Sequence, residues 1–216
     1  EDFNIPLYLS HTVAEIHGTD RVTGVTIAKV DQSRNIIDSS RRYIPCDTLL
    51  LSVGLIPENE LTRAAGIPID PVTNGALVDE NRETAVDGIF ACGNVLQVHD
   101  LVDYVSDEAE LAGVGAANYV LHAKNTTAAV PTKAGFGVRY VLPQRVHTDT
   151  ACDTALFLRV AQPFGKVRFT VKAGDAVLTT AVRLKAAPGE MEKLTLKAEK
   201  LHGVQTPITV ELEEIP

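Results

Sequence analysis

The sequence predicts two architectures in one chain, an α/β part that carries a β-meander and then an all-β sandwich. A nearly continuous apolar run at residues 46–51 is typical of a strand buried on both faces of a parallel sheet. Small and apolar residues at helical spacing follow Ser106 and predict a helix. Beyond residue 134, short runs of alternating apolar and polar residues are separated by turn signals, which is the pattern of a sandwich.

Composition limits what the chain can be. Its 216 residues are 45% hydrophobic and 22% charged, which suits one large or two ordinary globular domains. The formal net charge of -8 argues against nucleic-acid binding and against docking on an anionic membrane. No apolar run approaches the roughly 20 residues of a membrane span. The cysteines, Cys46, Cys92 and Cys152, show no C-x-x-C spacing, so we expect a reduced, cytoplasmic protein.

The first part of the chain reads as strands and turns. Residues 12–17, 22–30 and 40–44 favour an antiparallel meander, and the buried strand 46–51 follows them. Gly54 lies just past the carboxyl end of that strand. A short helix is expected at residues 60–65, closed by Gly66, and Asn74-Gly75 predicts a tight turn.

Residues 84–94 form a candidate ligand-binding edge. A turn at Gly88 leads into a short apolar strand at residues 89–92, which ends at Gly93-Asn94. Ligands of open α/β sheets lie outside the carboxyl ends of strands, and a glycine there lets the backbone approach closely. The alternative is a plain strand followed by a tight turn.

A helix is expected to begin at Ser106, which can cap it. The acidic residues of its first turn suit the positive end of a helix dipole. We interpret Glu108 and Glu110 as an exposed helix face.

The second part is expected to be a separate all-β domain. Residues 122–133 are polar and alanine-rich, contain Pro131 and read as a linker. The strands that we expect are residues 138–142, 156–160, 167–172, 177–184, 194–196 and 208–212. An immunoglobulin-like topology is one candidate, although the chain has no Trp and no Cys…Trp…Cys signature. These patterns predict domains at residues 1–124 and 134–216.

Two stretches together resemble the FAD-dependent pyridine nucleotide (disulfide) oxidoreductases, of the NAD(FAD)-dependent dehydrogenase type. Residues 46–57, CDTLLLSVGLIP, are similar to the segment that ends the pyridine-nucleotide insert of that family. Residues 84–94, TAVDGIFACGN, resemble its second flavin motif. The resemblance covers roughly residues 5–122 and implies a partial FAD/NAD(P)-binding three-layer fold from the carboxyl-terminal part of such a protein.

The resemblance implies a set of cofactor-binding residues. Asn94 would hold the ribityl chain of FAD, and Gly93 would permit its close approach. The backbone amides of Val105 and Ser106 would face the N1/O2 edge of the flavin ring, and Gly54 would lie beside the nicotinamide or flavin. The alternative without a cofactor is that the helix only packs on the fold and that Gly54 forms a simple turn at the end of a strand.

This sequence departs from the family pattern at several places. The family usually has Asp where Asn94 stands, and Asn keeps an acceptor oxygen without the charge. Neither of the two G-x-G-x-x-G turns of the family is present, because the nearest string, at residues 113–118, falls inside the expected helix. The redox C-x-x-C is also missing. The chain begins without Met, so we expect a piece of a longer protein that lacks stable FAD affinity by itself.

One further cluster is a candidate set of metal ligands. His99, Asp100 and Asp103 have loose ligand spacing but no evident fourth ligand, so we interpret them as a solvated acidic loop and predict no metal site. His99 is kept as an alternative proton donor because it lies close to the flavin motif.

Two functions follow from the sequence. The first is part of an oxidoreductase that transfers hydride between NAD(P) and FAD in the intact protein, with an unidentified small-molecule substrate. The second is a non-catalytic interaction module whose β-sandwich docks a partner subunit. Whether the chain acts as an enzyme by itself is left open.

Overall fold

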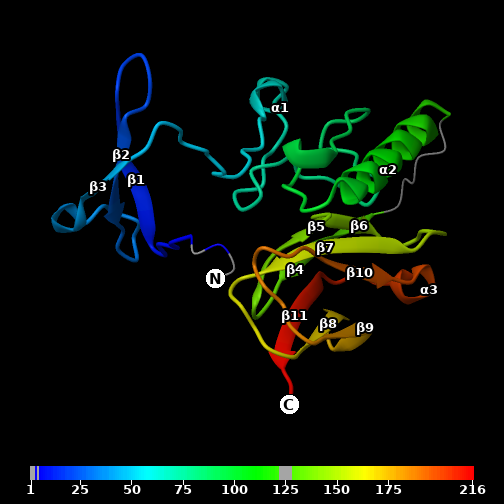
Figure 1. Cartoon of the computed structure of the whole chain (residues 1–216). Helices are drawn as coiled ribbons and strands as arrows, with labels where there is room; N and C mark the ends of the chain where they lie inside the picture. Colours follow the sequence, from blue (N-terminus) through cyan, green and yellow to red (C-terminus); the bar gives the residue numbers. More distant parts are fainter. Residues whose placement is uncertain (1–2, 4, 122–127) are drawn as a thin grey trace. The chain divides into compact units, whose positions relative to one another are not determined.

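The computed structural model describes residue 3 and residues 5–121 and 128–216. It divides into two compact units, residues 1–54 and residues 55–216, which are described separately below (Figure 1). The predicted division at residues 124–134 falls inside the second unit. The loops of the α/β part and the β-sandwich therefore form one compact body.

The first unit is the β-meander that the sequence predicted. Strands β1 (His11–His17), β2 (Gly24–Lys29) and β3 (Arg42–Pro45) pair antiparallel in the order β1-β2-β3. A short 3-10 helix, η1 (Asp38–Ser40), precedes β3. Strand β2 is the central strand and contributes the best buried side chains of this unit, with Ala28 fully buried and Val25 nearly so.

The predicted buried strand at residues 46–51 is wrong. These residues have no strand assignment, and Leu50 is 88% exposed. A parallel strand forms only where neighbouring strands satisfy its backbone groups on both sides. No strand of the described residues pairs with this segment, so its apolar side chains stay uncovered.

The second unit begins with turns and two helices. Helix α1 (Glu60–Ala64) ends as predicted before Gly66, whose φ is +72°, and Asn74 has φ +59° in the predicted turn. The predicted strand at residues 89–92 is reduced to one bridge between Glu83 and Phe90. It leads into the 3-10 helix η2 (Gly93–Val95). Of the helices in the described residues, none combines the length and apolarity needed to cross a membrane.

Helix α2 (Val102–Val120) begins four residues before the predicted start at Ser106. Ser106 therefore does not cap the helix, and its hydroxyl instead donates to the Val102 carbonyl oxygen at 3.2 Å. Leu101 occupies the cap position without a side-chain hydrogen bond to the helix. The string at residues 113–118 lies inside α2, as predicted.

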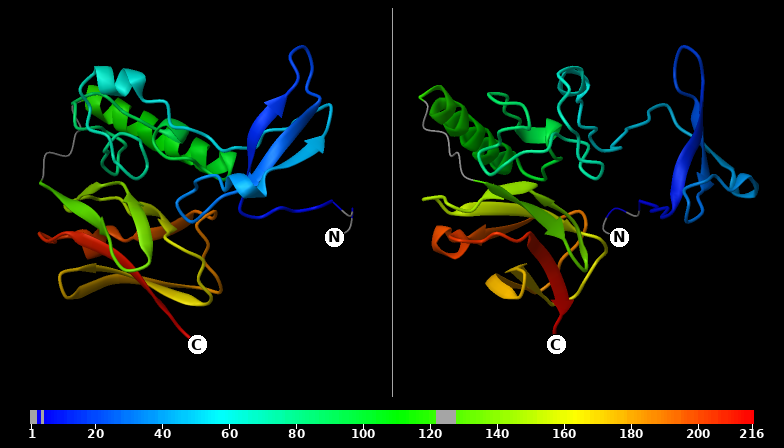
Figure 2. Two further views of the ribbon diagram at one scale, coloured as in Figure 1. Left: turned by 90° about the vertical axis from the view of Figure 1, so that its left-hand side faces the viewer. Right: turned by 180° about the vertical axis from the view of Figure 1, so that it is seen from behind.

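The remaining strands form two sheets that lie in separate layers (Figure 2). One sheet has the order β10-β7-β5, and the other has the order β6-β4-β11-β8-β9. The strands are β4 (Ala129–Ala134), β5 (Val138–Leu142), β6 (Arg145–His147), β7 (Thr154–Val160), β8 (Val167–Ala173), β9 (Ala176–Arg183), β10 (Glu192–Leu196) and β11 (Ile208–Glu214). A short helix, α3 (Ala198–Leu201), follows β10.

All six expected strands are present, but two others were missed. Strand β6 is only three residues long, and β4 contains Pro131 within the predicted linker. The linker prediction is therefore wrong for residues 129–133, and its residues 122–127 lie outside the described part. Strand β4 forms because β6 pairs with it antiparallel and β11 pairs with it parallel. An immunoglobulin-like topology stays a prediction.

The main core lies between the two sheets and follows the alternation in the sequence. Val167, Phe169 and Val171 of β8 are fully buried, and Leu156 and Leu158 of β7 complete the same cluster from the other sheet. Each such side chain stabilises the fold by about 1.5–3 kcal/mol relative to an exposed position.

The outer face of the β10-β7-β5 sheet is also covered. In β5 a bulge between Val138 and Tyr140 shifts the register, so that Tyr140 and Leu142 join a second core. That core contains Ile67, Ala76, Val78 and Leu96 from the preceding loops. The ring of Tyr104 in α2 meets Phe157 of β7 at 6.3 Å between ring centroids. Helix α2 and the loops before it are therefore packed on the sandwich.

Two glycines of α2 provide a matched test of this packing. A Cβ at Gly115 would lie 2.5 Å from the backbone oxygen of Asn81, whereas a Cβ at Gly113 would meet nothing within 4 Å. We expect Gly115→Ala to lower the free energy of unfolding by about 1–3 kcal/mol through overpacking. We expect Gly113→Ala to raise it by up to about 1 kcal/mol through helix propensity. Urea denaturation measures both, and equal effects would contradict the packing of α2 described here.

Candidate functional site

The side chain of Glu108 is the centre of the loops that contain the flavin-like motif. It is fully buried on α2 and accepts four hydrogen bonds. Its Oε1 accepts from Arg82 Nε at 3.1 Å and from Gln97 Nε2 at 3.2 Å. Its Oε2 accepts from the Gly93 backbone N–H at 2.8 Å and lies 2.9 Å from His99 Nε2. These five residues are called the Glu108 network below.

The network joins three separate segments of the chain between residues 82 and 108. Arg82 comes from a turn in which its own φ is +65°, an uncommon conformation for a residue with a side chain. Gly93 begins η2, and Gln97 and His99 follow in the loop toward α2. A buried carboxylate is costly unless it is paired and hydrogen-bonded, and here both conditions are met.

The surroundings of Glu108 keep it ionised. Burial alone would raise its pKa, but the hydrogen bond from His99 and the charge of Arg82 outweigh burial, and the pKa lies below its ordinary value of 4.5. The neighbouring Cys92 thiol shows the opposite effect, because burial and the Glu108 charge both raise its pKa. Cys92 is therefore a protonated thiol at neutral pH.

Residues of the β-sandwich contact this network. The Arg82 guanidinium lies over the ring of Phe157, 5.6 Å from its centroid, and Tyr140 Oη donates to Gln97 Oε1 at 3.3 Å. Next to it, Asp100 accepts from Arg159 Nη2 at 2.5 Å and from the Met191 backbone N–H at 2.7 Å. The loop that carries the motif is thus attached to β5, β7 and the segment before β10.

Two buried nitrogen atoms of the network have no hydrogen-bond partner in the described residues, Arg82 Nη2 and His99 Nδ1. A buried polar atom without a partner costs about 1–3 kcal/mol. Such atoms in a native structure call for an explanation, of which an ordered water or a bound group is the commonest.

The structure brings Gly93 and Asn94 together with the start of α2. Gly93 has φ +75°, which favours glycine, and a Cβ built there would come within 3.6 Å of Val105 Cγ1. Asn94 is exposed, and its Oδ1 accepts from the His99 backbone N–H at 3.0 Å. A carbonyl oxygen has two lone pairs, so this acceptor can take one more hydrogen bond.

The other predicted binding residues are placed differently. Because α2 begins at Val102, its free N–H groups are those of its first turn, residues 102–104, and the Val105 and Ser106 amides lie one turn further along. Gly54 ends the first compact unit, with φ +92° and nothing within 4 Å of a Cβ built there. The predicted motif thus corresponds to a turn at residues 93–95 and a helix that begins at Val102.

Sequence reasoning missed most of the Glu108 network. Glu108 is not an exposed helix face, and His99 does not belong to a solvated loop, because it is only 8% exposed. Asp100, which belongs to the same candidate set of metal ligands, pairs with Arg159 instead. A carboxylate placed among small residues was a weak signal, and nothing local could have named Arg82 or Gln97 as its partners.

Comparison with known proteins identifies the family. The model of the pyridine nucleotide-disulphide oxidoreductase family matches residues 1–118. The probable ferredoxin reductase CtmF of Castellaniella defragrans is 35% identical over 85 residues, which are 38% of this chain and 20% of that protein. The mitochondrial dihydrolipoyl dehydrogenase of Caenorhabditis elegans is 35% identical over 86 residues, 39% of this chain and 17% of that protein.

A third relative is the NADH oxidase of Streptococcus pneumoniae serotype 4. It is 35% identical over 101 residues, 46% of this chain and 19% of that protein. The aligned regions thus span about a fifth of the length of these relatives. The chain belongs to the pyridine nucleotide-disulphide oxidoreductase family, which uses FAD and NAD(P).

Substitution at Glu108 tests the network. We expect Glu108→Gln to lower the free energy of unfolding by about 3–5 kcal/mol at neutral pH, because it removes one partner of a buried ion pair. The control Glu110→Gln, an exposed residue of the same helix, should change it by less than about 0.5 kcal/mol.

The same pair of variants has a defined pH dependence. A carboxyl with a lowered pKa in the folded state contributes stability above its unfolded value of 4.5, and this is lost as pH falls through the folded pKa. The difference between wild type and Glu108→Gln should therefore shrink below about pH 4.5. Urea midpoints measured across that range check it, and a constant difference would contradict an ionised Glu108.

Proposed function

We propose that this chain is part of an NAD(P)-linked flavoprotein oxidoreductase, and that residues 93–104 form the ribityl side of its FAD site. The observation that carries the proposal is the Gly93-Asn94 turn, which precedes α2 in the chain and brings Gly93 beside Val105 near the start of that helix. Membership of the family supports the class of cofactor. The relatives named above support hydride transfer as the general reaction.

The residues present fit one half of such a site. Asn94 is exposed and retains a lone pair on Oδ1 for a ribityl hydroxyl. The N-cap residue of α2 is Leu101, and its side chain makes no capping hydrogen bond. The first N–H groups of the helix therefore have no acceptor in that side chain. Such N–H groups favour negative charge, as on the N1/O2 edge of a reduced flavin.

Each residue of the site has a separate task in this proposal. The bound flavin would supply the redox chemistry itself. Asn94 would orient the ribityl chain, and the first turn of α2 would stabilise charge on the ring. Gly93 would permit close approach, and Glu108 would hold its backbone N–H so that the turn keeps one geometry.

Val105 and Gly54 retain narrower roles. The Val105 side chain would pack beside Gly93 and limit the space next to the turn. The backbone amides of residues 102–104, in place of those of Val105 and Ser106, would face the N1/O2 edge of the flavin. Gly54 has a positive φ and open space around it, which would let a cofactor approach its backbone. The substrate is proposed only as a small molecule or a protein electron carrier.

The proposal is tested on the complete polypeptide expressed from the native gene, whatever its length. We expect the purified protein to show flavin absorbance, or to gain it with added FAD. Asn94→Leu should weaken FAD binding about fivefold, because one neutral hydrogen bond contributes about 1 kcal/mol. Asn94→Asp should retain binding, since it keeps the acceptor.

The control is Asn118→Leu, an exposed residue near the other end of α2, which should leave FAD binding unchanged. Binding is measured by quenching of flavin fluorescence. A complete protein that neither contains nor takes up flavin would contradict the proposal and favour the interaction module.

A further inference from the structure

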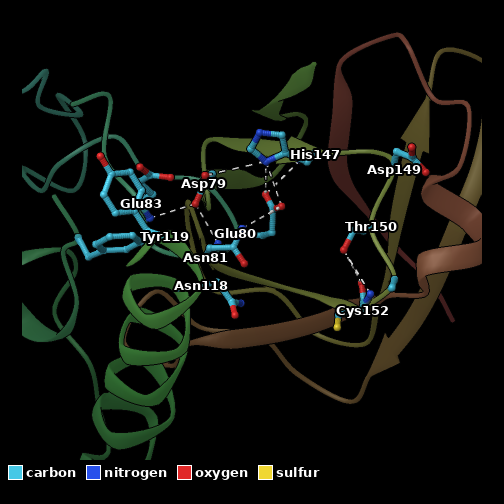
Figure 3. A pocket seen from close by; sticks show the side chains of 13 residues that line it. Asp79, Glu80, Asn81, Glu83, Asn118, Tyr119, His147, Asp149, Thr150 and Cys152 are labelled. Atoms are coloured by element: carbon cyan, nitrogen blue, oxygen red, sulfur yellow. Dashed lines mark hydrogen bonds and ion pairs between the residues drawn. The ribbon is translucent and has the colours of Figure 1, made fainter. Parts of the chain in front are cut away.

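A pocket separate from the Glu108 network lies between the turn at residues 79–83, helix α2 and the segment after β6 (Figure 3). Its volume is about 310 Å³. Four carboxylates line it, those of Asp79, Glu80, Glu83 and Asp149, and His147 is the one basic residue among the lining residues. Acidic side chains thus outnumber basic ones in this lining, which favours binding of a cation.

Three of these side chains converge on one point. One ligand atom each from Asp79, Glu80 and His147 lies within 4.8 Å of the other two. His147 Nδ1 lies 3.0 Å from Glu80 Oε1 and 3.9 Å from Asp79 Oδ2, so the imidazole nitrogen faces both carboxylates. The exposed fractions of these side chains are only 2%, 10% and 13%.

The positions of these groups are set by the fold. Asp79 Oδ1 accepts from the backbone N–H groups of Asn81 and Glu83 at 2.9 and 3.0 Å, which leaves Oδ2 to face the histidine. Glu80 Oε2 also accepts from the His147 backbone N–H at 3.1 Å. Strand β6 brings His147 to this turn by pairing with β4.

Electrostatics favour a positive charge at this point. Asp79 and Glu80 place two carboxylates side by side where water reaches them poorly, since the exposed fractions of their side chains are 2% and 10%. A positive charge between them would offset their mutual repulsion.

We infer that Asp79, Glu80 and His147 form a binding site for a divalent transition cation such as Zn²⁺. One imidazole nitrogen and two carboxylate oxygens are a ligand set of zinc and similar ions, whereas Mg²⁺ and Ca²⁺ prefer oxygen ligands alone. Bonds of about 2.0–2.2 Å place tetrahedral donors closer together than the 3.9 Å that separates His147 Nδ1 from Asp79 Oδ2, so these two side chains would draw together on binding. Water from the pocket would complete the coordination.

The ion would join the turn at residues 79–83 to the sandwich. This role does not depend on FAD binding, so the test needs no flavin. It also gives the pocket a function that the family resemblance does not assign. The same turn includes Arg82, which donates to Glu108, so the ion would also stabilise the loop that contributes Arg82 to the Glu108 network.

The test measures Zn²⁺ binding to the whole chain after treatment with a chelator and in the presence of excess Mg²⁺. Isothermal titration calorimetry should show one saturable Zn²⁺ per chain, and Zn²⁺ should raise the melting temperature. Glu80→Gln keeps the size and hydrogen-bonding capacity of the side chain but removes its charge. We expect it to weaken binding at least tenfold, since even outer partners of metal ligands contribute about 10–100-fold.

His147→Gln should weaken binding to a similar degree, and circular dichroism should show that both variants fold. The control His11→Gln removes a histidine of strand β1 in the first compact unit and should leave binding unchanged. Absence of saturable binding to the wild type would overturn the inference. So would binding that survives both ligand variants or is lost in His11→Gln, because other histidines would then hold the ion.

Discussion

The buried carboxylate of Glu108 is the interaction on which the loops of the second unit depend. It gathers a guanidinium, an amide, an imidazole and a backbone N–H at one point. These donors come from segments with little regular secondary structure, so the carboxylate adds to isolated backbone hydrogen bonds such as the one from the Ala91 N–H to the Arg82 carbonyl oxygen. An ionised acceptor inside a low-dielectric environment forms stronger hydrogen bonds than a neutral one, which suits it to this task.

The β-sandwich makes that arrangement possible because side chains pack on both faces of its β10-β7-β5 sheet. The inner faces of its sheets form a core of alternating apolar residues, whereas the outer face of β5 and β7 receives the loops and α2. Phe157 illustrates the division, because it lies between Leu156 and Leu158 in sequence but contacts Arg82 and Tyr104 on the opposite side. The family-matched segment from residue 55 onward therefore shares one compact unit with the sandwich that follows it.

The same physical distinction explains which predictions succeeded. The six strands of the sandwich that were predicted carry local alternation, and the meander and α1 carry clear turn signals. The predictions that failed concern segments whose structure depends on partners that are distant in the sequence. Residues 46–51 have the composition of a buried strand but no neighbouring strands among the described residues, whereas β4 contains a proline and is ordered by β6 and β11.

The sequence by itself determined the family, through two motifs in the right order, and it led to the prediction that the Gly93-Asn94 turn binds the cofactor. It also determined the strand pattern of the sandwich, because alternation is a property of neighbouring residues. The tertiary structure decided the rest. Only folding shows that Glu108 is buried, that α2 starts at Val102, and that Glu80 meets His147 across 67 positions of sequence. Hydrogen bonds between distant segments leave no local trace in the sequence, since each partner alone looks like an ordinary surface residue.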